Sequence, residues 1–427
     1  MGPPIDARAI HRSGWKCRLC GDSAAPQVLH RFGCIPVAGY LETDKAAAHE
    51  APRLELDIAL CSACGLVQQA SDAARTILIE RVYSQYQPTY AMSARVAAYM
   101  EFFLDEAVGR AGTTRSDTVV EVGSNDGSVL AMIAARGFSA IGFEPSPTLN
   151  STARRKGATV VEDYFGTRSA AAFLQSHPKP RLVISRHTLE HAFEPLDFLR
   201  GIAQLLGAGG IAAIEVPYLR LQAMNNQFPS MTFQHVSFFT VSSMKRALDQ
   251  AGLKLIDVIF VNMDGGSMIA FASANESRRG SDVTQTVLEL EGMLQLDRPA
   301  GYERFFTRVA EQRTQIHQHL QYITSRGHTV LGYGAGSKGQ ALVNMLGCSS
   351  EELPFVIDDV PGNAGCFIPG PAIPIIASND ERARSAQYML ITAPTHVAEI
   401  VAKERERLGS RVRFLSIVPE FHYVSAP

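Results

Sequence analysis

Runs of consecutive apolar residues, set between stretches with helical spacing, fill most of the middle of the chain. Four such runs lie at residues 118–122, 140–143, 182–185 and 211–216. Continuous apolar runs of this length are typical of strands buried on both faces, and their alternation with helices is typical of parallel sheets. The pattern therefore predicts a doubly wound α/β sheet in this part of the chain.

The same alternation returns near the C-terminus. Apolar runs at 329–333, 354–358 and 388–392 follow a charged stretch at 281–325, which we expect to form one or two helices. This second set of strands predicts a second α/β unit.

The first part of the chain has a different texture. Residues 1–80 contain short strand-like pieces and turns, and residues 82–108 are predicted to be largely helical. We therefore predict three domains: a small N-terminal module at 1–80, an α/β domain with an N-terminal lid helix at 81–280, and a second α/β domain at 281–427.

The N-terminal module contains two copies of the motif Cys-x-x-Cys-Gly, at residues 17–21 and 61–65. Two cysteines separated by two residues can bind one metal ion from a tight turn, and the glycine lets the backbone turn beneath the sulfur atoms. Four thiolates are the usual number in a closed structural zinc site. We predict such a site at Cys17, Cys20, Cys61 and Cys64. A closed site has no open coordination position, so we expect catalysis elsewhere in the chain.

Composition narrows the class of protein. The hydrophobic content of 46%, the charged content of 19% and the net charge of −2 fit a globular protein and favour neither nucleic acid nor a membrane surface. The use of four of seven cysteines in the two motifs fits a reducing compartment. No signal pattern and no apolar run of roughly 18 residues is present, so we expect a cytoplasmic protein, either a monomer or a homodimer.

The strand at 118–122 leads into a turn of sequence Gly-Ser-Asn-Asp-Gly and then a helix. Ligands of doubly wound sheets bind beyond the carboxyl ends of the strands, and glycines let a ligand approach the backbone closely. The next strand ends at Glu144, which can accept hydrogen bonds from both hydroxyls of a ribose. The turn suits an adenosine that carries an amino acid better than a pyrophosphate, and it looks like motif I of the class I S-adenosylmethionine methyltransferases. An ordinary tight turn is the alternative. The predicted donor contacts here are Gly123, Asn125, Gly127 and Glu144.

Two further segments would complete this donor site. Asp163 and Tyr164 follow the third strand, where an acidic or aromatic side chain meets the adenine, and Ser185 closes the fourth strand beside the sulfonium. Each of these signals alone would be weak evidence for a donor site.

Two histidines are candidates for catalysis. His191 lies just past the fourth strand and His235 lies in a later loop, and both regions are expected to face the donor. Methyl transfer to carbon needs a base that removes a proton beside a carbonyl, and imidazole suits this because its pKa of about 6.5 leaves free base at neutral pH. We predict that His235 is the base and that His191 polarises or holds the carbonyl oxygen. Structural histidines, or His187 as the functional member of its loop, are the alternatives.

A second glycine-rich turn, Gly-Tyr-Gly-Ala-Gly-Ser-Lys-Gly at 332–339, resembles a dinucleotide fingerprint, and Asp358 follows the next strand. Taken alone it predicts NAD. A helix N-terminus framed by glycines binds any phosphate, however, and Lys338 would reinforce a pyrophosphate site. The alternative is a degenerate Rossmann-like domain without a nucleotide, in which Asp358 caps the turn.

Other predicted substrate contacts lie outside the glycine turns. Three tyrosines near the predicted lid could close over the site, although an aromatic packing stripe accounts for them equally well. With Gln234, the neighbour of the proposed base, and Lys338, the predicted substrate contacts are Tyr83, Tyr86, Tyr90, Gln234 and Lys338.

The order of a four-cysteine module, a class I methyltransferase domain and a Rossmann-like domain resembles the sugar C-methyltransferases of deoxysugar biosynthesis. The likeness covers nearly the whole chain and includes the two cysteine motifs and the segments 119–127, 189–191, 215–219, 235–239, 265–267, 337–339 and 369–374. It implies S-adenosylmethionine as the donor, structural zinc, a nucleotide-linked keto-deoxysugar as the substrate, a base at His235 and a second pocket histidine at His191. It also implies that the last domain is not a redox module.

One loop departs from the family pattern. The family commonly has Tyr-His-Glu-His-Leu-Ser-Tyr-Phe where residues 232–239 are Thr-Phe-Gln-His-Val-Ser-Phe-Phe. The neutral Gln234 replaces a carboxylate that could orient the base or raise its pKa. The resemblance therefore identifies the family more firmly than the substrate or the acceptor atom.

Three rival functions fit parts of the sequence. The first is methyl transfer to an oxygen or nitrogen of another small molecule, which does not need an acidic carbon. The second is an NAD-dependent sugar oxidoreductase, which would use the second glycine turn. The third is a binding protein stabilised by zinc, which would bind no donor. Exchange of the substrate's α-proton in the absence of donor, and equilibrium binding of NAD against S-adenosylmethionine, distinguish these possibilities.

Overall fold

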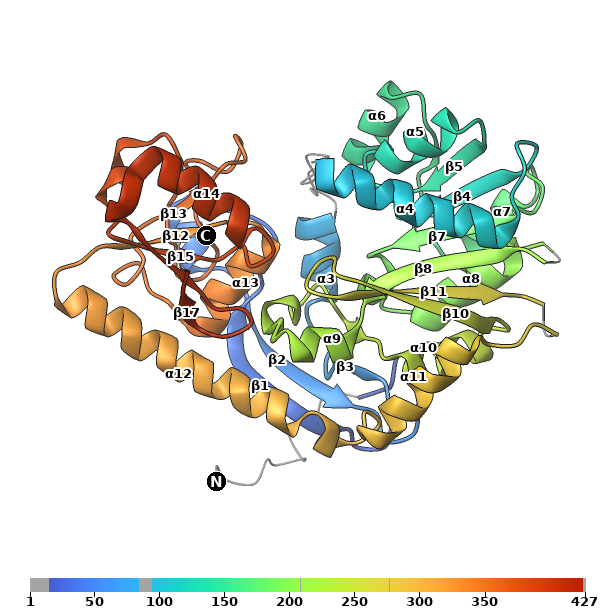
Figure 1. The fold of residues 1–427 in the computed structure, drawn as a ribbon, viewed down its shortest axis with the longest axis horizontal. Helices are drawn as coiled ribbons and strands as arrows, with labels where there is room; N and C mark the ends of the chain where they lie inside the picture. The colour runs from blue at the N-terminus through green and yellow to red at the C-terminus, as the bar shows by residue number, and fades with distance from the viewer. Residues whose placement is uncertain (1–14, 84–93, 208, 276, 425–427) are drawn as a thin grey trace.

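The computed structural model describes residues 15–83, 94–207, 209–275 and 277–424, which form three β-sheets with their helices (Figure 1). The largest sheet has seven strands in the order β10-β11-β8-β7-β4-β5-β6, and all pair in parallel except β11, which is antiparallel to both neighbours. The strands are β4 (Thr118–Val122), β5 (Ser139–Phe143), β6 (Thr159–Val161), β7 (Leu182–Arg186), β8 (Ile211–Pro217), β10 (Lys254–Val261) and β11 (Ser267–Ser273). This confirms the predicted α/β fold and its central strands.

Helices cover both faces of this sheet, which explains why its strands are apolar throughout. Val119 packs with Phe103 of α4 on one face, while the next residue, Val120, packs with Phe198 of α8 on the other. The helices are α4 (Ala94–Ala111), α5 (Ser128–Ala135), α6 (Pro147–Arg155), α7 (Thr167–Phe173), α8 (Pro195–Leu205) and α10 (Val241–Gln250), with the short α9 (Leu219–Met224), η2 (Leu189–His191) and η3 (Phe228–Ser230). Among the described residues, no helix is long and apolar enough to cross a bilayer.

The C-terminal sheet has six strands in the order β14-β13-β12-β15-β16-β17, and all but the last are parallel. Its strands are β12 (Val330–Tyr333), β13 (Val356–Asp358), β14 (Ile375–Ala377), β15 (Tyr388–Ile391), β16 (Arg413–Ser416) and β17 (His422–Tyr423), and its helices are α13 (Ser337–Leu346) and α14 (Val397–Leu408). The charged stretch before it forms α11 (Asp282–Met293) and α12 (Glu303–Ser325), as predicted. Short 3-10 turns lie at Pro299–Gly301, Glu381–Ser385 and Gly409–Arg411.

The third sheet belongs to two distant parts of the sequence. Its antiparallel order is β1-β2-β3-β9, in which β1 (Gln27–Pro36), β2 (Arg53–Leu60) and β3 (Val67–Gln69) come from the N-terminal module and β9 (Ser237–Phe238) comes from the larger α/β unit. The helices α2 (Lys45–His49), α3 (Arg75–Ile77) and the π-helix η1 (Leu78–Tyr83) complete this module. The first part of the chain is therefore paired, strand to strand, with the loop that carries His235.

The hydrophobic core under this sheet is also shared. Phe32 of β1, Ile316 of the long α12 and Leu342 of α13 belong to one buried cluster, and Figure 1 shows α12 running from the C-terminal sheet along β1. His30 stacks on Phe306 of α12 with ring centroids 5.0 Å apart. The N-terminal sheet thus packs on both α/β units, and the predicted boundaries at residues 80 and 280 remain predictions.

A buried carboxylate fixes α11 to the larger α/β unit. Glu291 is 2% exposed and accepts hydrogen bonds from Tyr218 Oη (2.8 Å), Val241 N (2.8 Å), Ser242 N (2.7 Å) and Ser242 Oγ (2.6 Å). Two of the donors are backbone N–H groups at the start of α10, so Glu291 also caps that helix.

We expect Glu291→Ala to lower the free energy of unfolding by about 3 kcal/mol, because it leaves several buried donors without an acceptor. Glu289→Ala removes an exposed carboxylate from the same helix and is the matched control. Urea unfolding followed by circular dichroism measures both, and equal losses in the two variants would contradict the role of Glu291.

Candidate active site

The predicted donor turn lies at the carboxyl ends of β4 and β5. Gly123, Asn125 and Gly127 all have positive φ, of 80°, 50° and 75°. A Cβ at position 127 would lie 2.7 Å from the Cβ of Ala153, and one at position 123 would lie 2.2 Å from Oγ1 of Thr188. Both glycines are therefore required by the backbone conformation and by the close approach of neighbouring segments.

Glu144 points into this turn from the end of β5. Its carboxylate is 8% exposed and accepts hydrogen bonds from Asn125 N at 3.1 Å and Ser146 N at 3.0 Å. Burial raises the pKa of Glu144 above its ordinary value, while these two backbone N–H groups act to lower it. The carboxylate and the turn are thus held together where a ribose is predicted.

Three polar atoms beside the turn lack partners within the described part of the chain. They are Oγ of Ser124, Oγ of Ser185 and Oε2 of Glu121, and all three residues are less than 5% exposed. Burial raises the pKa of Glu121 to about 8. Because buried polar groups normally have hydrogen-bond partners, this edge of the sheet fits a polar ligand such as S-adenosylmethionine.

The two residues predicted near the adenine lie on the rim. Tyr164 is 52% exposed, and Asp163 pairs with Arg168 at 3.4 Å. The neighbouring Phe165 packs edge-on against Phe143, with ring centroids 5.0 Å apart. Glu144 N donates to the backbone oxygen of Val161 at 3.1 Å, so this segment follows β6 beside the end of β5, and its contacts to a donor remain predictions.

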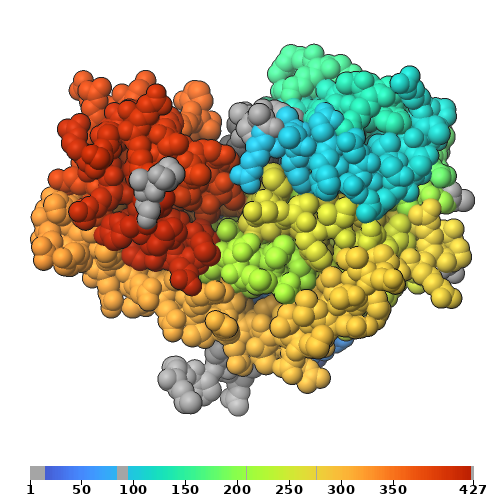
Figure 2. Space-filling view, viewed as in Figure 1, coloured from blue at the N-terminus to red at the C-terminus, as the bar shows by residue number. Residues whose placement is uncertain are grey.

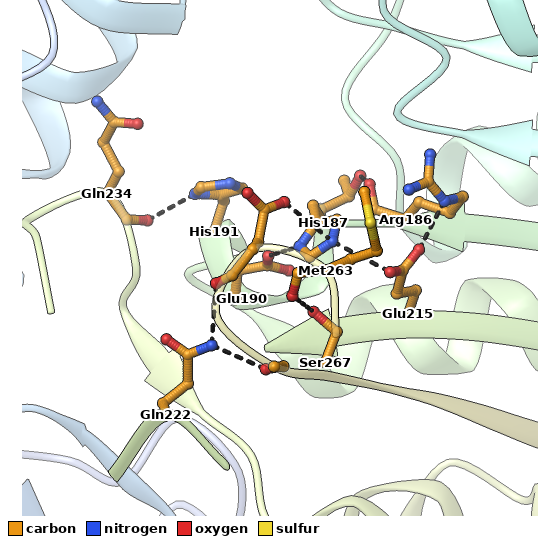
Figure 3. Close-up of polar contacts among 12 residues, drawn as sticks. Arg186, His187, Glu190, His191, Glu215, Gln222, Gln234, Met263 and Ser267 are labelled. Carbon is orange, nitrogen blue, oxygen red and sulfur yellow. Dashed lines mark hydrogen bonds and ion pairs between the residues drawn. The ribbon is translucent and has the colours of Figure 1, made fainter. Parts of the chain in front are cut away.

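The two candidate catalytic histidines lie side by side. Their ring centroids are 4.9 Å apart. Nδ1 of His191 lies 2.8 Å from the backbone oxygen of Gln234, and Figure 3 draws this contact as a dashed line. Because a carbonyl oxygen only accepts hydrogen bonds, Nδ1 of His191 carries a proton. Nε2 is then the nitrogen of His191 that is free to take up a proton or contact a ligand.

His235 is a neutral imidazole at neutral pH. Burial lowers the pKa of His235 well below 6.5, and the nearby His191, Lys338 and His187 lower it further. A base in this state is available over a wide pH range, although its low pKa makes it weaker.

His187, in contrast, is held as a cation. Its Nδ1 lies 3.2 Å from Glu190, and its Nε2 lies 3.3 Å from Glu215 and 3.5 Å from Asp264. Burial alone would lower the pKa of His187, but these carboxylates outweigh burial and raise its pKa to about 10. Its backbone has a φ of 47°, which few side chains other than Asn, Asp and His adopt readily.

The carboxylate of Glu215, at the end of β8, is fully buried and is also paired on its other side (Figure 3). It accepts hydrogen bonds from Arg186 Nε and from Tyr99 Oη of α4, both at 2.6 Å. Burial acts to raise the pKa of Glu215, but Arg186 and His187 outweigh it and lower the pKa to about 2. The charged groups therefore fix α4, β7 and β8 relative to one another.

The C-terminal domain contributes side chains to the same region. Nζ of Lys338 lies 3.2 Å from Asp264, which lies in the loop between β10 and β11, and Nε2 of Gln234 donates to Ser337 Oγ at 2.7 Å. Lys338 is the main cause of the lowered pKa of Asp264. The first residues of α13 thus meet the loop that carries His235.

Asp358 makes hydrogen bonds within and beside the second glycine turn. Asp358 accepts hydrogen bonds from Ala335 N at 2.6 Å, Val360 N at 2.9 Å and Asn363 Nδ2 at 3.0 Å. In a dinucleotide site the equivalent carboxylate would bind the ribose. Asp358 thus contacts the backbone of its turn as Glu144 does in the first turn, and both the dinucleotide site and the capped turn without a nucleotide remain predictions.

Of the three predicted lid tyrosines, Tyr83 lies in the site. Its ring is 6.1 Å from that of His191, and its hydroxyl donates to the backbone oxygen of Gln234 at 3.4 Å. Tyr86 and Tyr90 lie outside the described residues.

The four cysteines of the two motifs converge as predicted, with all four sulfur atoms within 4.8 Å of one another. The Sγ atoms of Cys17 and Cys64 are 3.5 Å apart, and those of Cys20 and Cys61 are 3.6 Å apart. Sulfur atoms around a tetrahedral zinc ion, at about 2.3 Å from the metal, are about 3.8 Å apart. The donor set therefore fits zinc.

Glu190, His191 and His235 also offer ligand atoms within 4.8 Å of one another. The cationic His187 beside Glu190, and Lys338 beside His235, oppose the binding of a further cation there. The geometry and charge therefore fit proton transfer better than metal binding.

A cavity of about 520 Å³ lies between the two α/β units, and Figure 2 shows this face of the molecule hollowed between them. One wall has the amides of Asn225, Gln227 and Asn262, and the other has Pro394 and Pro419. Gln227 also lines the small space beside His235. Neither of the two histidines is among the residues that line the cavity, and Gln227 lies between the cavity and the space at His235.

Several residues of the site had no clear signal in the sequence. Glu121, Glu215 and Asp264 are single carboxylates whose neighbours come from distant segments. His187 had one signal, its place directly after the fourth strand, and was an alternative prediction.

Two family models match the chain. One, described as a methyltransferase domain, matches residues 92–258, and the other, described as a C-methyltransferase C-terminal domain, matches residues 262–419. The curated C-methyltransferase NovU of Streptomyces niveus is 30% identical over 417 residues, which cover 96% of this chain and 97% of the relative. The chain belongs to the C-methyltransferase family. It is an S-adenosylmethionine-dependent methyltransferase.

Two solved structures that resemble this C-methyltransferase each cover less than half of its chain. An S-adenosylmethionine-dependent methyltransferase from Clostridium acetobutylicum is 10% identical with a TM-score of 0.34, and covers 45% of this chain and 96% of its own. A magnesium protoporphyrin IX methyltransferase from Synechocystis with bound S-adenosylmethionine is 15% identical with a TM-score of 0.32, and covers 47% of this chain and 91% of its own. These scores are too low to bear on substrate or mechanism.

Stability should depend on pH through His187. Its pKa is about 10 in the folded state and 6.5 as the ordinary value, so its charge stabilises the fold fully below pH 6.5. This contribution is lost as pH rises from 6.5 to about 10, by at most about 1.4 kcal/mol per pH unit.

The variant His187→Asn tolerates the positive φ and does not titrate, so it should lack this decline. Urea unfolding at pH 6, 8 and 9.5 compares the two proteins. An identical fall in stability in both would show that His187 is not held as a cation.

Proposed function

We propose that this enzyme methylates a carbon next to the keto group of a nucleotide-linked deoxysugar, with an enolate as the intermediate. The observation that carries the proposal is the pairing of His191 and His235, with ring centroids 4.9 Å apart. Gln227 lines both the small space at His235 and the cavity between the two α/β units. S-adenosylmethionine, when bound, supplies an electrophilic methyl group. The residues that would hold it are Gly123, Asn125, Gly127, Glu144, Asp163, Tyr164 and Ser185.

His235 is proposed as the base because its lowered pKa leaves it unprotonated. Removal of the α-proton transfers that proton to His235 and leaves a negative charge on the substrate oxygen. A base with a low pKa needs this oxygen to be stabilised strongly. In its protonated form, His191 can donate from Nδ1 to Gln234 and from Nε2 to the oxygen, so both of its hydrogen bonds have an acceptor.

A nucleotide-linked sugar fits the polar wall of the cavity. The amides of Asn225, Gln227 and Asn262 are suited to hydroxyl groups and carbonyls. Lys338 and the start of α13 lie on the same side as the histidines, where a diphosphate would gain a positive charge and free helix N–H groups. To bind it, Lys338 would exchange its contact with Asp264 for the phosphate. Gln234 and Tyr83 complete the proposed substrate contacts.

We also propose that Cys17, Cys20, Cys61 and Cys64 hold a structural zinc ion. Three of the four cysteines are buried and Cys20 is half-buried, and Gln68 Nε2 lies 3.1 Å from the sulfur of Cys17. A hydrogen bond to a ligating sulfur is the kind of contact that orients metal ligands.

The first experiment tests His235. His235→Ala should abolish methylation of a nucleotide-linked keto-deoxysugar and should also abolish exchange of its α-proton in D₂O without donor. The affinity for S-adenosylmethionine, measured by calorimetry, should not change. Retained exchange in the variant would exclude His235 as the base, and a wild-type enzyme that methylates an oxygen or nitrogen would exclude the proposed acceptor.

The pH profile provides a second test of the same residue. Because the pKa of His235 lies well below 6.5, kcat/KM should stay constant down to below pH 6 and fall only in more acidic buffer. An acid limb centred on pH 6.5 would show an ordinary, exposed histidine instead.

The donor site is tested by Glu144→Gln. Loss of the charged acceptor for the ribose hydroxyls should weaken S-adenosylmethionine binding by about tenfold or more. Glu162→Gln, at an exposed position after β6, is the matched control. Equal affinities of the two variants would place the donor elsewhere.

A further inference from the structure

One side chain of the N-terminal sheet holds the loop that carries His235. Gln69 is the last residue of β3 and is 3% exposed. Its Nε2 donates to the backbone oxygens of Thr232 at 2.8 Å, Phe233 at 2.9 Å and His235 at 2.9 Å. The amide NH₂ has two protons for three acceptors, so it is fully used by this loop.

The remaining carbonyls of the loop are also occupied. The backbone N of Gln69 donates to the oxygen of Val236 at 3.1 Å, and Nδ1 of His191 donates to the oxygen of Gln234 at 2.8 Å. Of the five consecutive carbonyls from 232 to 236, four therefore accept from Gln69, although that of Thr232 also accepts from His235 N. The fifth, that of Gln234, accepts from His191 and from Tyr83. Loss of the amide would leave buried acceptors without partners.

The preceding residue connects this contact to the metal site. Nε2 of Gln68 lies 3.1 Å from Sγ of Cys17, and Oε1 of Gln68 accepts from Arg18 N at 3.0 Å. Arg18 Nη1 also donates to the backbone oxygen of Gln69 at 2.7 Å. Consecutive side chains of a strand point to opposite faces, so Gln68 reaches the cysteine motif while Gln69 reaches the loop.

We propose that Gln69 is a positioning residue for His235, and that the metal site of the N-terminal module fixes the direction of this histidine through Gln68 and Gln69. The proposal rests on the proposed roles of His235 as the base and of the four cysteines as zinc ligands. In this arrangement the metal takes no part in the chemistry. It holds β3 at the distance at which one amide can order the catalytic loop.

Hydrogen exchange of the full chain tests the contact without any substrate. In Gln69→Leu the backbone amides of residues 232–236 should exchange about ten- to a hundredfold faster than in the wild type. Gln69→Asn keeps the amide on a shorter side chain and should retain part of the protection. Gln312→Leu removes another buried amide, which donates to Ile417 O and Pro419 O, and should leave this loop unchanged.

Metal removal tests the coupling. Wild-type protein loaded with Zn²⁺ and the same protein treated with a chelator should differ in the exchange of residues 232–236, with faster exchange in the metal-free form. In Gln69→Leu, metal removal should add little to the exchange of this loop. Unchanged exchange in metal-free wild type would overturn the coupling, and it does not depend on whether the leucine variant folds well.

Kinetics separate positioning from general destabilisation. Gln69→Leu should lower kcat while the affinity for S-adenosylmethionine stays the same. The acid limb of kcat/KM should also move up toward pH 6.5, because burial is the main reason for the low pKa of His235 and a loosened loop would bury it less. Gln312→Leu should show neither change. Gln69→Leu with wild-type loop exchange and wild-type pH profile would overturn the role of Gln69. If wild-type enzyme shows no C-methylation and no α-proton exchange, the proposed function fails, and the loop exchange still decides whether Gln69 orders the loop.

Discussion

The buried carboxylate of Glu215 is the interaction on which the rest of this site depends. Removing a carboxylate from water costs several kcal/mol unless other charges and donors surround it. Arg186, His187 and Tyr99 provide those contacts from β7, the loop after it and α4. Because each partner comes from a different segment, the carboxylate stays buried only when these segments are in their native positions.

The charges around Glu215 also set the protonation of the two kinds of histidine. His187 is surrounded by three carboxylates and is cationic, whereas His235 is neutral mainly because burial lowers its pKa, and the nearby His191, Lys338 and His187 lower that pKa further. The same ionisable group thus has two roles within one cleft, and the difference comes from the neighbours rather than from the residue type. Asp264 and Lys338 extend these charges to the C-terminal domain.

The repeating patterns of the sequence were sufficient to predict the α/β class and the central strands. Apolar runs predicted the central strands of both α/β units, but not β10, β11, β14, β16 or β17. The two cysteine motifs predicted a four-sulfur cluster, which the structure brings together. The turn at 123–127 and the placement of Glu144 were also predictable, since both depend on local sequence and on the edge at which parallel strands end. In all three cases a short sequence pattern predicted the structure that the same pattern forms.

Contacts between distant segments could not be predicted. No periodic signal links Gln69 with residues 232–236 or places β9 in the N-terminal sheet. Both predictions for the second glycine turn, a dinucleotide site and a capped turn without a nucleotide, are compatible with the hydrogen bonds that Asp358 accepts from Ala335, Val360 and Asn363. The hydrogen-bond partners of a carboxylate or an amide depend on tertiary packing. Patterns in a single sequence do not reveal these partners.

The pairing of β3 with β9 has a consequence for any attempt to recombine this enzyme with its relatives. In a chimera that joins the first eighty residues of one parent to the remainder of the other, paired strands would come from different parents. The loop carbonyls and the side chain that binds them would also come from different parents. Junctions for domain exchange are therefore better placed where few contacts cross them, and the short segment 232–238 should travel with the N-terminal module although it lies far from it along the chain.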